Sequence, residues 1–174
     1  MNRLLPLLAL SCLACSPDEE EKDGPPIYGG SDTGEESCAG TPPTIIYMDI
    51  ENGGFKDFEG AQWPTILLQV DARDDDGDLE FATLEMWWDA EVDGQVDTSS
   101  EPLTKKIFTT DALPCRQNDG SYGLYLQVGT GLGYNTAYDF AARVGDASAL
   151  RSEVEIESMV TPKEDGSDGD PLEG

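Results

Sequence analysis

Histidine is missing from this chain of 174 residues. Its absence excludes Ser-His-Asp and Cys-His nucleophile systems, the paired-histidine zinc helix of proteases, and any imidazole metal ligand. Basic residues are scarce, since 10 Lys and Arg stand against 36 Asp and Glu, for a formal net charge of −26. We therefore expect no nucleic-acid partner, because phosphate binding needs clustered Lys and Arg. Adhesion of the protein surface itself to anionic lipid is disfavoured for the same reason.

The chemistry that survives these absences is carboxylate catalysis or a Ser-Lys pair. With 36 acidic residues, many carboxylates lie close together by chance, and no pair stands out as a general acid and base. We therefore expect no enzyme, and a small carboxylate-based hydrolase is the catalytic alternative. The acidity itself has two interpretations: repulsion that favours solubility, or the binding of divalent cations.

Long apolar runs are also lacking, apart from one at the N-terminus. There Met1-Asn2-Arg3 is followed by an almost unbroken apolar stretch from Leu4 to Ala14. A cationic start before about ten apolar residues is typical of a secretory signal, and a membrane-spanning helix needs about twenty. We predict that residues 1–14 form a signal peptide.

The end of this signal, Leu13-Ala14-Cys15, resembles the lipobox of bacterial lipoproteins. In that family the signal is cut before a cysteine that receives a diacylglycerol group, so the resemblance implies a lipid anchor on Cys15. Cys12 is a rival acceptor, and an ordinary signal peptide with incidental cysteines is the simpler alternative. Ser16, which is not Asp, is similar to the residue that follows the cysteine in lipoproteins of the outer membrane, where the domain would face the periplasm or the outside.

Cysteine pairing favours Cys15 over Cys12 as the acceptor. Cutting before Cys15 removes Cys12 and leaves Cys38 and Cys115 as an even pair. Export places that pair in an oxidising compartment, so we predict a Cys38–Cys115 disulfide. The bond would join the end of an N-terminal tether to the loop before the fifth strand, and would contribute about 4 kcal/mol in the chain-entropy model.

Composition divides the rest of the chain into three parts. Residues 15–43 form an acidic tether rich in Pro and Gly, and residues 162–174 form a similar acidic tail. Such segments cannot bury enough apolar surface to offset the entropy cost of ordering, so we expect both to be disordered. Residues 44–161 remain as one domain.

Apolar residues alternate with polar ones through this domain, and turn signals such as Asp75-Asp76-Gly77 separate the runs. This period of two predicts strands with one buried face, and about seven of them at this spacing predict an antiparallel β-sandwich. In the first predicted strand, residues 46–50, the inner face carries Ile46, Met48 and Ile50. The other predicted strands lie at residues 66–72, 82–88, 103–109, 122–128, 138–144 and 154–160.

Two segments carry a family resemblance. The stretch 133–147 (GYNTAYDFAARVGDA) resembles the sixth strand and following turn of immunoglobulin-like and fibronectin type III-like domains. The stretch 70–79 (VDARDDDGDL) is similar to the second strand and turn of bacterial immunoglobulin-like and polycystic-kidney-disease-type domains. The resemblance implies a seven-stranded immunoglobulin-like sandwich, with Trp88 in its core and Tyr138 near a corner hydrogen bond.

The densest acidic segment is a candidate calcium site. Calcium takes six to eight oxygen ligands, and an aspartate-rich turn beside a strand supplies several, here Asp71, Asp74, Asp76 and Asp78. The spacing does not match the common calcium loop, so such a site would need a donor from elsewhere, for example Glu51 or Asp146. A solvated turn, in which Asp bonds to its own backbone, is the simpler alternative.

Two further features suggest roles at the surface. Trp87 and Trp88 are adjacent on one strand and must point to opposite faces. If Trp88 is in the core, Trp87 lies outside with Phe81, either exposed to a protein or glycan partner or covered by a loop or tail. Lys105-Lys106 is typical of an edge strand guarded against further pairing.

The sequence therefore predicts a lipid-anchored envelope protein that acts as a non-catalytic binding or structural module. A calcium-dependent adhesion module built on the turn from Asp71 to Asp78 is the alternative.

Overall fold

The computed structural model describes Cys38 and residues 40–172. The predicted signal peptide, both candidate lipid acceptors, Cys12 and Cys15, and most of the predicted tether lie outside these residues. Within the described part of the chain, no helix has the length and apolar character needed to cross a membrane.

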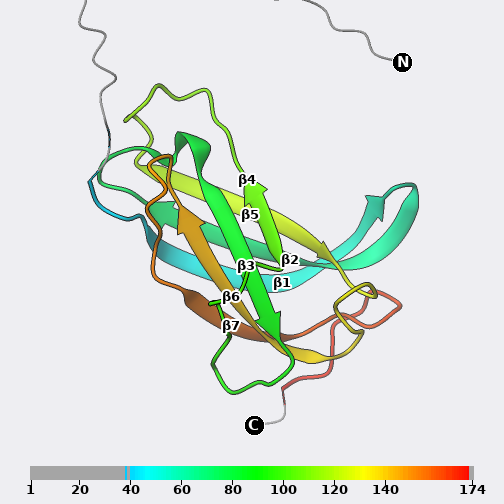
Figure 1. Cartoon of the computed structure of the whole chain (residues 1–174). Coiled ribbons are helices and arrows are strands. Elements are labelled where there is room, and N and C mark those ends of the chain that lie inside the picture. Colours follow the sequence, from blue (N-terminus) through cyan, green and yellow to red (C-terminus); the bar gives the residue numbers. More distant parts are fainter. Residues whose placement is uncertain (1–37, 39, 173–174) are drawn as a thin grey trace, which may run out of the picture. The chain divides into compact units, whose positions relative to one another are not determined.

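Seven strands form two antiparallel sheets, in the orders β1-β2-β5 and β4-β3-β6-β7 (Figure 1). A 3-10 turn, η1, precedes β3. The predicted all-β, seven-stranded antiparallel sandwich is confirmed. The elements are β1 (Thr44–Phe58), β2 (Ala61–Arg73), η1 (Leu79–Phe81), β3 (Thr83–Asp89), β4 (Thr104–Ile107), β5 (Asp119–Gln127), β6 (Ala137–Gly145) and β7 (Glu155–Val160).

The core between the sheets is built from the alternating side chains of the inner strands. Side chains two residues apart on a strand share a face, so each strand contributes a row of apolar groups to one layer. Burial of each large side chain contributes about 1.5–3 kcal/mol. The core residues that the central strands β2, β3 and β6 contribute at 0% exposure are Ile66, Leu68, Val70, Leu84, Met86, Phe140, Ala142 and Val144.

A β-bulge changes the predicted pattern of β1. The register with β2 shifts between Ile45 and Tyr47, so Ile46 has no paired residue opposite it. One extra residue moves the following side chains to the other face. Ile45 is therefore buried, whereas Ile46 is 58% exposed, and the expectation that Ile46 lies on the inner face is wrong.

The two tryptophans point to opposite faces of β3, as expected. Trp88 packs against the core between the sheets. Trp87 lies on the other face but is only 2% exposed, and its indole N–H donates to the Ser100 carbonyl of the loop between β3 and β4, at 3.1 Å. Phe81 lies in η1, not on the strand, and is 52% exposed. Trp87 and Phe81 therefore do not form a joint aromatic surface, because a loop covers Trp87.

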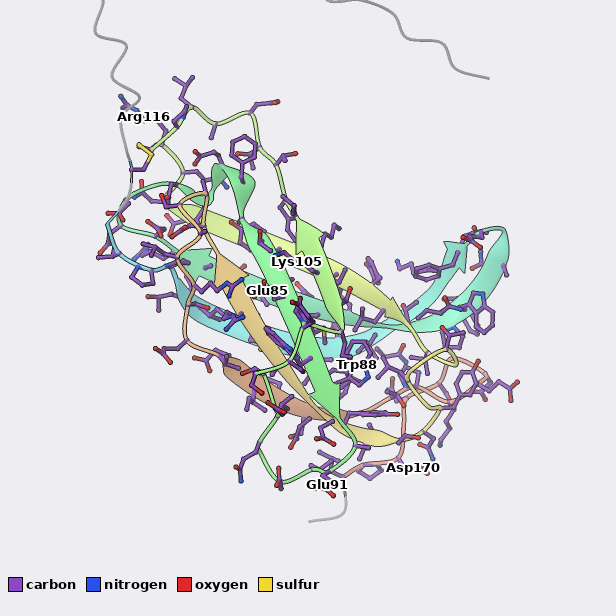
Figure 2. The ribbon with its side chains drawn as sticks, in the orientation of Figure 1. Glu85, Trp88, Glu91, Lys105, Arg116 and Asp170 are labelled. Atoms are coloured by element: carbon purple, nitrogen blue, oxygen red, sulfur yellow. A yellow bond between two sulfur atoms is a disulfide. The ribbon has the colours of Figure 1, made fainter. Side chains whose placement is uncertain are left out.

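Glu85 gathers the basic side chains on the outer face of the second sheet. The carboxylate accepts from Arg143 at 2.8 Å, from Lys105 at 3.2 Å and from Arg151 at 3.3 Å, while the Glu85 side chain is 4% exposed. Lys105 reaches it from β4, an edge strand (Figure 2). Burial opposes ionisation of Glu85, but the hydrogen bonds from Arg143 and Lys105, together with the charges of Arg151 and Arg143, hold the pKa of Glu85 below its ordinary value.

The segment after β7 packs against the domain, which differs from the disordered tail expected for residues 162–174. The Asn52 side chain donates to the Gly166 carbonyl at 3.0 Å, and the Asp170 amide donates to Asn135 at 2.8 Å. Lys163 and Asp170 form an ion pair at 2.8 Å. Composition indicates that this segment cannot form a core, but side-chain amides of the domain can still bond its backbone.

Two predicted local features are present. Cys38 and Cys115 form a disulfide, with their Cα atoms 5.3 Å apart. The Tyr138 hydroxyl, at the start of β6, accepts from the Gly133 amide at 3.0 Å, as expected of a tyrosine at a corner.

Replacing Glu85 with Gln tests the cluster on the outer face. A carboxylate with a lowered folded-state pKa stabilises the fold above its unfolded pKa, near 4.5, and this contribution is lost as the pH falls. We expect Glu85→Gln to lower the free energy of unfolding by about 1–3 kcal/mol at pH 7, with a smaller difference at pH 3.5. Urea titration measures both. The exposed Glu91→Gln is the control, and equal stability of the two variants at pH 7 would contradict the assignment.

Candidate metal centre

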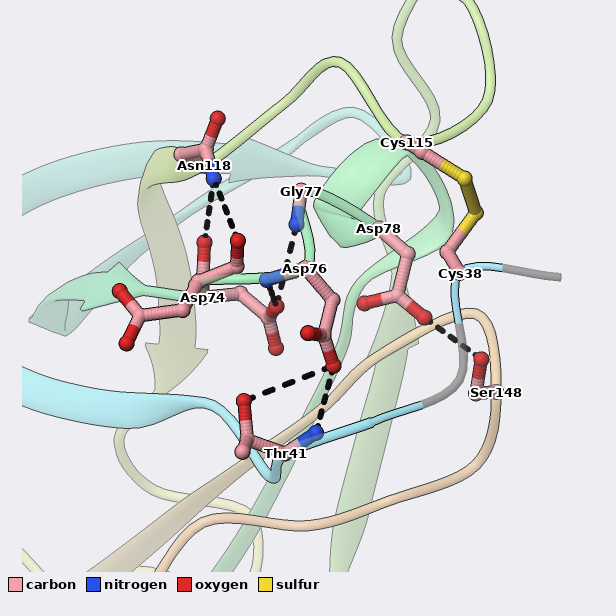
Figure 3. Close-up of a disulfide and its surroundings, with 10 residues drawn as sticks. Cys38, Thr41, Asp74, Asp76, Gly77, Asp78, Cys115, Asn118 and Ser148 are labelled. Carbon is pink, nitrogen blue, oxygen red and sulfur yellow. Dashed lines mark hydrogen bonds between the residues drawn. A yellow bond between two sulfur atoms is a disulfide. The ribbon is translucent and has the colours of Figure 1, made fainter. Parts of the chain in front are cut away.

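The aspartate-rich turn follows β2 directly and is held by its own first side chain. Asp74 Oδ1 accepts from the Asp76 amide at 2.7 Å and from the Gly77 amide at 3.2 Å (Figure 3). Gly77 has φ +78°, a conformation that favours glycine. The Asn118 side chain donates to the carbonyls of Asp74 and Asp75, at 2.8 and 3.2 Å. The turn is thus a defined structure and not a loose acidic loop.

Three carboxylates converge at this turn. Asp74 follows β2, Asp78 precedes η1 and Asp146 follows β6, and one oxygen of each lies within 4.8 Å of the others. Their residues are 1%, 0% and 6% exposed, respectively. The turn and the end of β6 therefore enclose three buried acids within a few ångströms.

In each of these carboxylates, one oxygen accepts a hydrogen bond from a described residue and the other does not. Asp74 Oδ1 is bound as described above, Asp78 Oδ2 accepts from the Ser148 hydroxyl at 2.6 Å, and Asp146 Oδ1 accepts from the Leu150 amide at 2.8 Å. The second oxygens, Asp74 Oδ2, Asp78 Oδ1 and Asp146 Oδ2, are buried without a hydrogen-bond partner among the described residues. An unsatisfied buried acceptor costs about 1–3 kcal/mol, and more when it is charged. The arrangement orients the carboxylates without neutralising them.

Burial and mutual repulsion shift the ionisation of the group. Burial, assisted by the charges of Asp78 and Asp74, raises the pKa of Asp146 to about 6, although the hydrogen bond from the Leu150 amide acts to lower it. Burial likewise raises the pKa of Asp74, assisted by the charge of Asp78. Burial, together with the charge of Asp74, raises the pKa of the Tyr122 phenol to about 12. The ionised cluster therefore destabilises the fold unless a positive charge compensates it.

The donor set fits a hard divalent cation. Carboxylate oxygens suit Ca²⁺ or Mg²⁺, whereas zinc sites use His and Cys. Oxygens on opposite sides of a Ca²⁺ ion, each bonded at about 2.3–2.6 Å, lie at most about 5 Å apart. The separation of 4.8 Å or less therefore lets one ion contact all three carboxylates. Backbone carbonyls or water would complete the coordination.

The structure brings together only part of the residue set expected from the sequence. Asp74 and Asp78 lie in the cluster, but Asp71 lies on β2 between Tyr47 and Ser121 of the neighbouring strands. Asp76 turns away and accepts from Thr41. The strand period signals the placement of Asp71, because Asp71 alternates with the inward-facing residues of β2.

The sequence suggested Glu51 or Asp146 as a metal ligand from outside the aspartate-rich turn, and one of the two lies in the cluster. Asp146 joins the cluster, whereas Glu51 accepts from Gln69 across β1 and β2, at 2.9 Å. Asp146 is 68 positions beyond Asp78, so only the antiparallel return of β6 brings the two together. Spacing along the chain carries no signal of that proximity.

The chain matches no protein-family model, and no curated protein or solved structure is significantly similar to it. The geometry of these residues is therefore the sole support for a metal centre.

Replacing Asp146 with Asn tests whether the carboxylates repel each other. A buried acid whose folded-state pKa is raised destabilises the fold above that pKa, and the penalty disappears towards the unfolded pKa of 3.8. In the presence of chelator at pH 8, we expect Asp146→Asn to raise the free energy of unfolding by about 1–3 kcal/mol, and the gain to vanish near pH 4. Urea titration at both pH values measures it. A loss of stability at pH 8 would contradict the repulsion.

Proposed function

We propose that this chain is a calcium-binding, non-catalytic β-sandwich module of the bacterial cell envelope. The observation that carries the proposal is the convergence of Asp74, Asp78 and Asp146, each buried and each with an oxygen that has no partner among the described residues. A bound cation would neutralise the cluster and complete the coordination of these oxygens. The metal then acts as a structural link between the ends of β2 and β6.

Calcium is preferred to magnesium because of how the ligands are held. Mg²⁺ demands near-ideal octahedral geometry at about 2.0–2.1 Å, whereas Ca²⁺ accepts variable geometry and longer bonds. The donors here come from two separate loops, after β2 and after β6, which favours the more tolerant ion. Calcium sites of extracellular modules bind weakly, with a Kd of about 10⁻⁴–10⁻³ M, which suits an exported protein.

The order of the strands supports an immunoglobulin-like type of sandwich. In that fold the second and fifth strands are neighbours in one sheet, and the third, sixth and seventh form the other. Here β2 lies beside β5, and β3-β6-β7 are consecutive. The hydrogen bond of Tyr138 supports the same assignment. The fourth strand departs from the seven-stranded immunoglobulin arrangement, in which it belongs to the sheet of the second and fifth strands. Here β4 pairs with β3 instead.

The proposed place in the envelope rests on the N-terminal sequence. The short apolar run that ends at Cys15 supports export and lipid attachment. The Cys38–Cys115 disulfide also supports export, since such bonds persist in oxidising compartments. We propose that the lipid fixes the location of the module and that the acidic segment before residue 38 sets its reach.

Metal-dependent stability tests the proposed function. We expect Ca²⁺ to raise the free energy of unfolding by about 2.7 kcal/mol at a hundredfold excess over its Kd, measured by thermal and urea unfolding after treatment with chelator. Mg²⁺ at equal ionic strength should have a smaller effect. Asp78→Asn should abolish the response to calcium.

Asp71→Asn is the matched control, because Asp71 belongs to the same acidic stretch but lies on the strand, outside the cluster. It should keep the full response to calcium. If wild-type protein gains no stability beyond the general effect of salt, the metal proposal fails.

Lipid attachment is tested separately by metabolic labelling. In a bacterial host, the wild-type chain and Cys12→Ala should incorporate labelled palmitate and fractionate with membranes. Cys15→Ala should do neither, because the lipid acceptor is gone. If incorporation depends on Cys12 instead, the lipid is attached to Cys12. If no variant incorporates palmitate, the proposal of a lipid anchor fails.

A further inference from the structure

Asp76 belongs to the turn but lies outside the candidate metal centre. It contacts the lead-in segment, defined as Cys38 together with Gly40 and Thr41. Asp76 Oδ2 accepts from the Thr41 amide at 2.5 Å and lies 3.5 Å from its hydroxyl (Figure 3). The two residues are 35 positions apart. Asp76 therefore connects the metal-binding turn to the place where the chain enters the sandwich.

Close packing and a covalent bond hold the same segment against the turn. A Cβ on Gly40 would lie 2.5 Å from Asp76 Oδ2, so only glycine allows this approach. Cys38 is bonded to Cys115, and a Cβ on Gly77 would lie 3.0 Å from the carbonyl carbon of Cys115. Within the turn, Asp76 thus lies against the lead-in segment and Gly77 lies against the backbone of Cys115.

Asp74 takes part in the candidate metal centre and also binds the backbone of Asp76. Asp74 Oδ1 accepts from the amide of Asp76, and the other oxygen of Asp74 is one of the three that lack a partner among the described residues. A cation that holds Asp74 would therefore also hold the backbone of Asp76, and with it the carboxylate that binds Thr41. Without the cation, repulsion from Asp78 and Asp146 acts on the carboxylate that supports the turn.

We propose that cation binding at Asp74, Asp78 and Asp146 immobilises the lead-in segment through Asp76, so that the metal sets how rigidly the sandwich is joined to the chain that precedes it. This inference rests on the proposed function. Asp76 is a positioning residue in it, not a metal ligand. The disulfide keeps the segment attached in both states, and the metal decides whether Thr41 is also held.

Amide hydrogen exchange on the full-length protein tests this coupling. In wild-type protein we expect calcium, compared with chelator, to slow exchange at the Thr41 amide at least tenfold. Asp76→Ala should keep calcium-dependent stabilisation with a Kd within threefold of wild type, but exchange at Thr41 should no longer respond to the metal. Asp78→Asn should lose both effects. Asp75→Ala, an exposed neighbour in the same turn, is the control and should retain both.

Core amides separate this local effect from general stabilisation. The Leu68 amide lies in the centre of β2 and reports global unfolding, so its response to calcium should be the same in wild type and in Asp76→Ala. If calcium stabilises wild-type protein but leaves exchange at Thr41 unchanged, the coupling is wrong and the metal site stands. If Thr41 responds equally in Asp76→Ala, the route through Asp76 is wrong. If calcium neither binds nor stabilises, both proposals fail.

Discussion

Repulsion among buried carboxylates constrains the end of the sandwich where β2 and β6 leave their sheets. Two unit charges 4.8 Å apart repel by on the order of 3 kcal/mol at an effective dielectric constant near 20, and three carboxylates make three such pairs. The net stability of a domain is only about 5–15 kcal/mol. The ionised cluster therefore needs a bound proton or a bound cation. Burial, assisted by the charges of Asp78 and Asp74, raises the pKa of Asp146, so this carboxyl binds a proton at a higher pH than an ordinary aspartate.

The surrounding structure explains how the carboxylates stay together despite this repulsion. The hydroxyl of Ser148 and the amide of Leu150 hold one oxygen each of Asp78 and Asp146. The Ala147 amide also donates to the Asp78 carbonyl at 3.0 Å, which joins the two loops through their backbones. These bonds fix positions and neutralise no charge. A site built in this way is organised in advance for a cation and loses little conformational freedom when one binds.

Sequence reasoning succeeded where the controlling interaction is local or repetitive. Alternation along single strands predicted the sandwich and its core, because a period of two maps directly onto one face of a strand. It was wrong at Ile46, where one inserted residue changes the face, and a bulge leaves no reliable mark in an apolar run. It placed Trp87 and Trp88 on opposite faces but left open whether a loop covers Trp87, which depends on the path of the residues between β3 and β4.

The candidate site, too, could be predicted from the sequence only in part. The Asp-rich turn is visible in the sequence, but which of its carboxylates point inward depends on the end of β2 and on the return of β6. Asp71 follows the alternation of the strand to the outer face, and Asp76 binds a segment 35 positions earlier. Proximity of this kind comes from topology, which composition and spacing do not encode.

Glu85 and the three carboxylates of the candidate metal centre are all buried, but they differ in their basic partners. Glu85 draws Lys105, Arg143 and Arg151 to a single carboxylate, although the whole chain has only 10 basic residues for 36 acidic ones. The three carboxylates of the candidate metal centre form no ion pair with Lys or Arg among the described residues.

A shortage of cations alone would spread the available side chains over the buried charges, since an uncompensated buried charge costs several kcal/mol. Three basic side chains on one carboxylate and none on three neighbouring carboxylates are instead consistent with two different sources of positive charge. Side chains neutralise Glu85, and at the end of β2 and β6 the proposed source is an ion from solution. An acidic protein can use such an ion as a structural element without adding a single lysine or arginine.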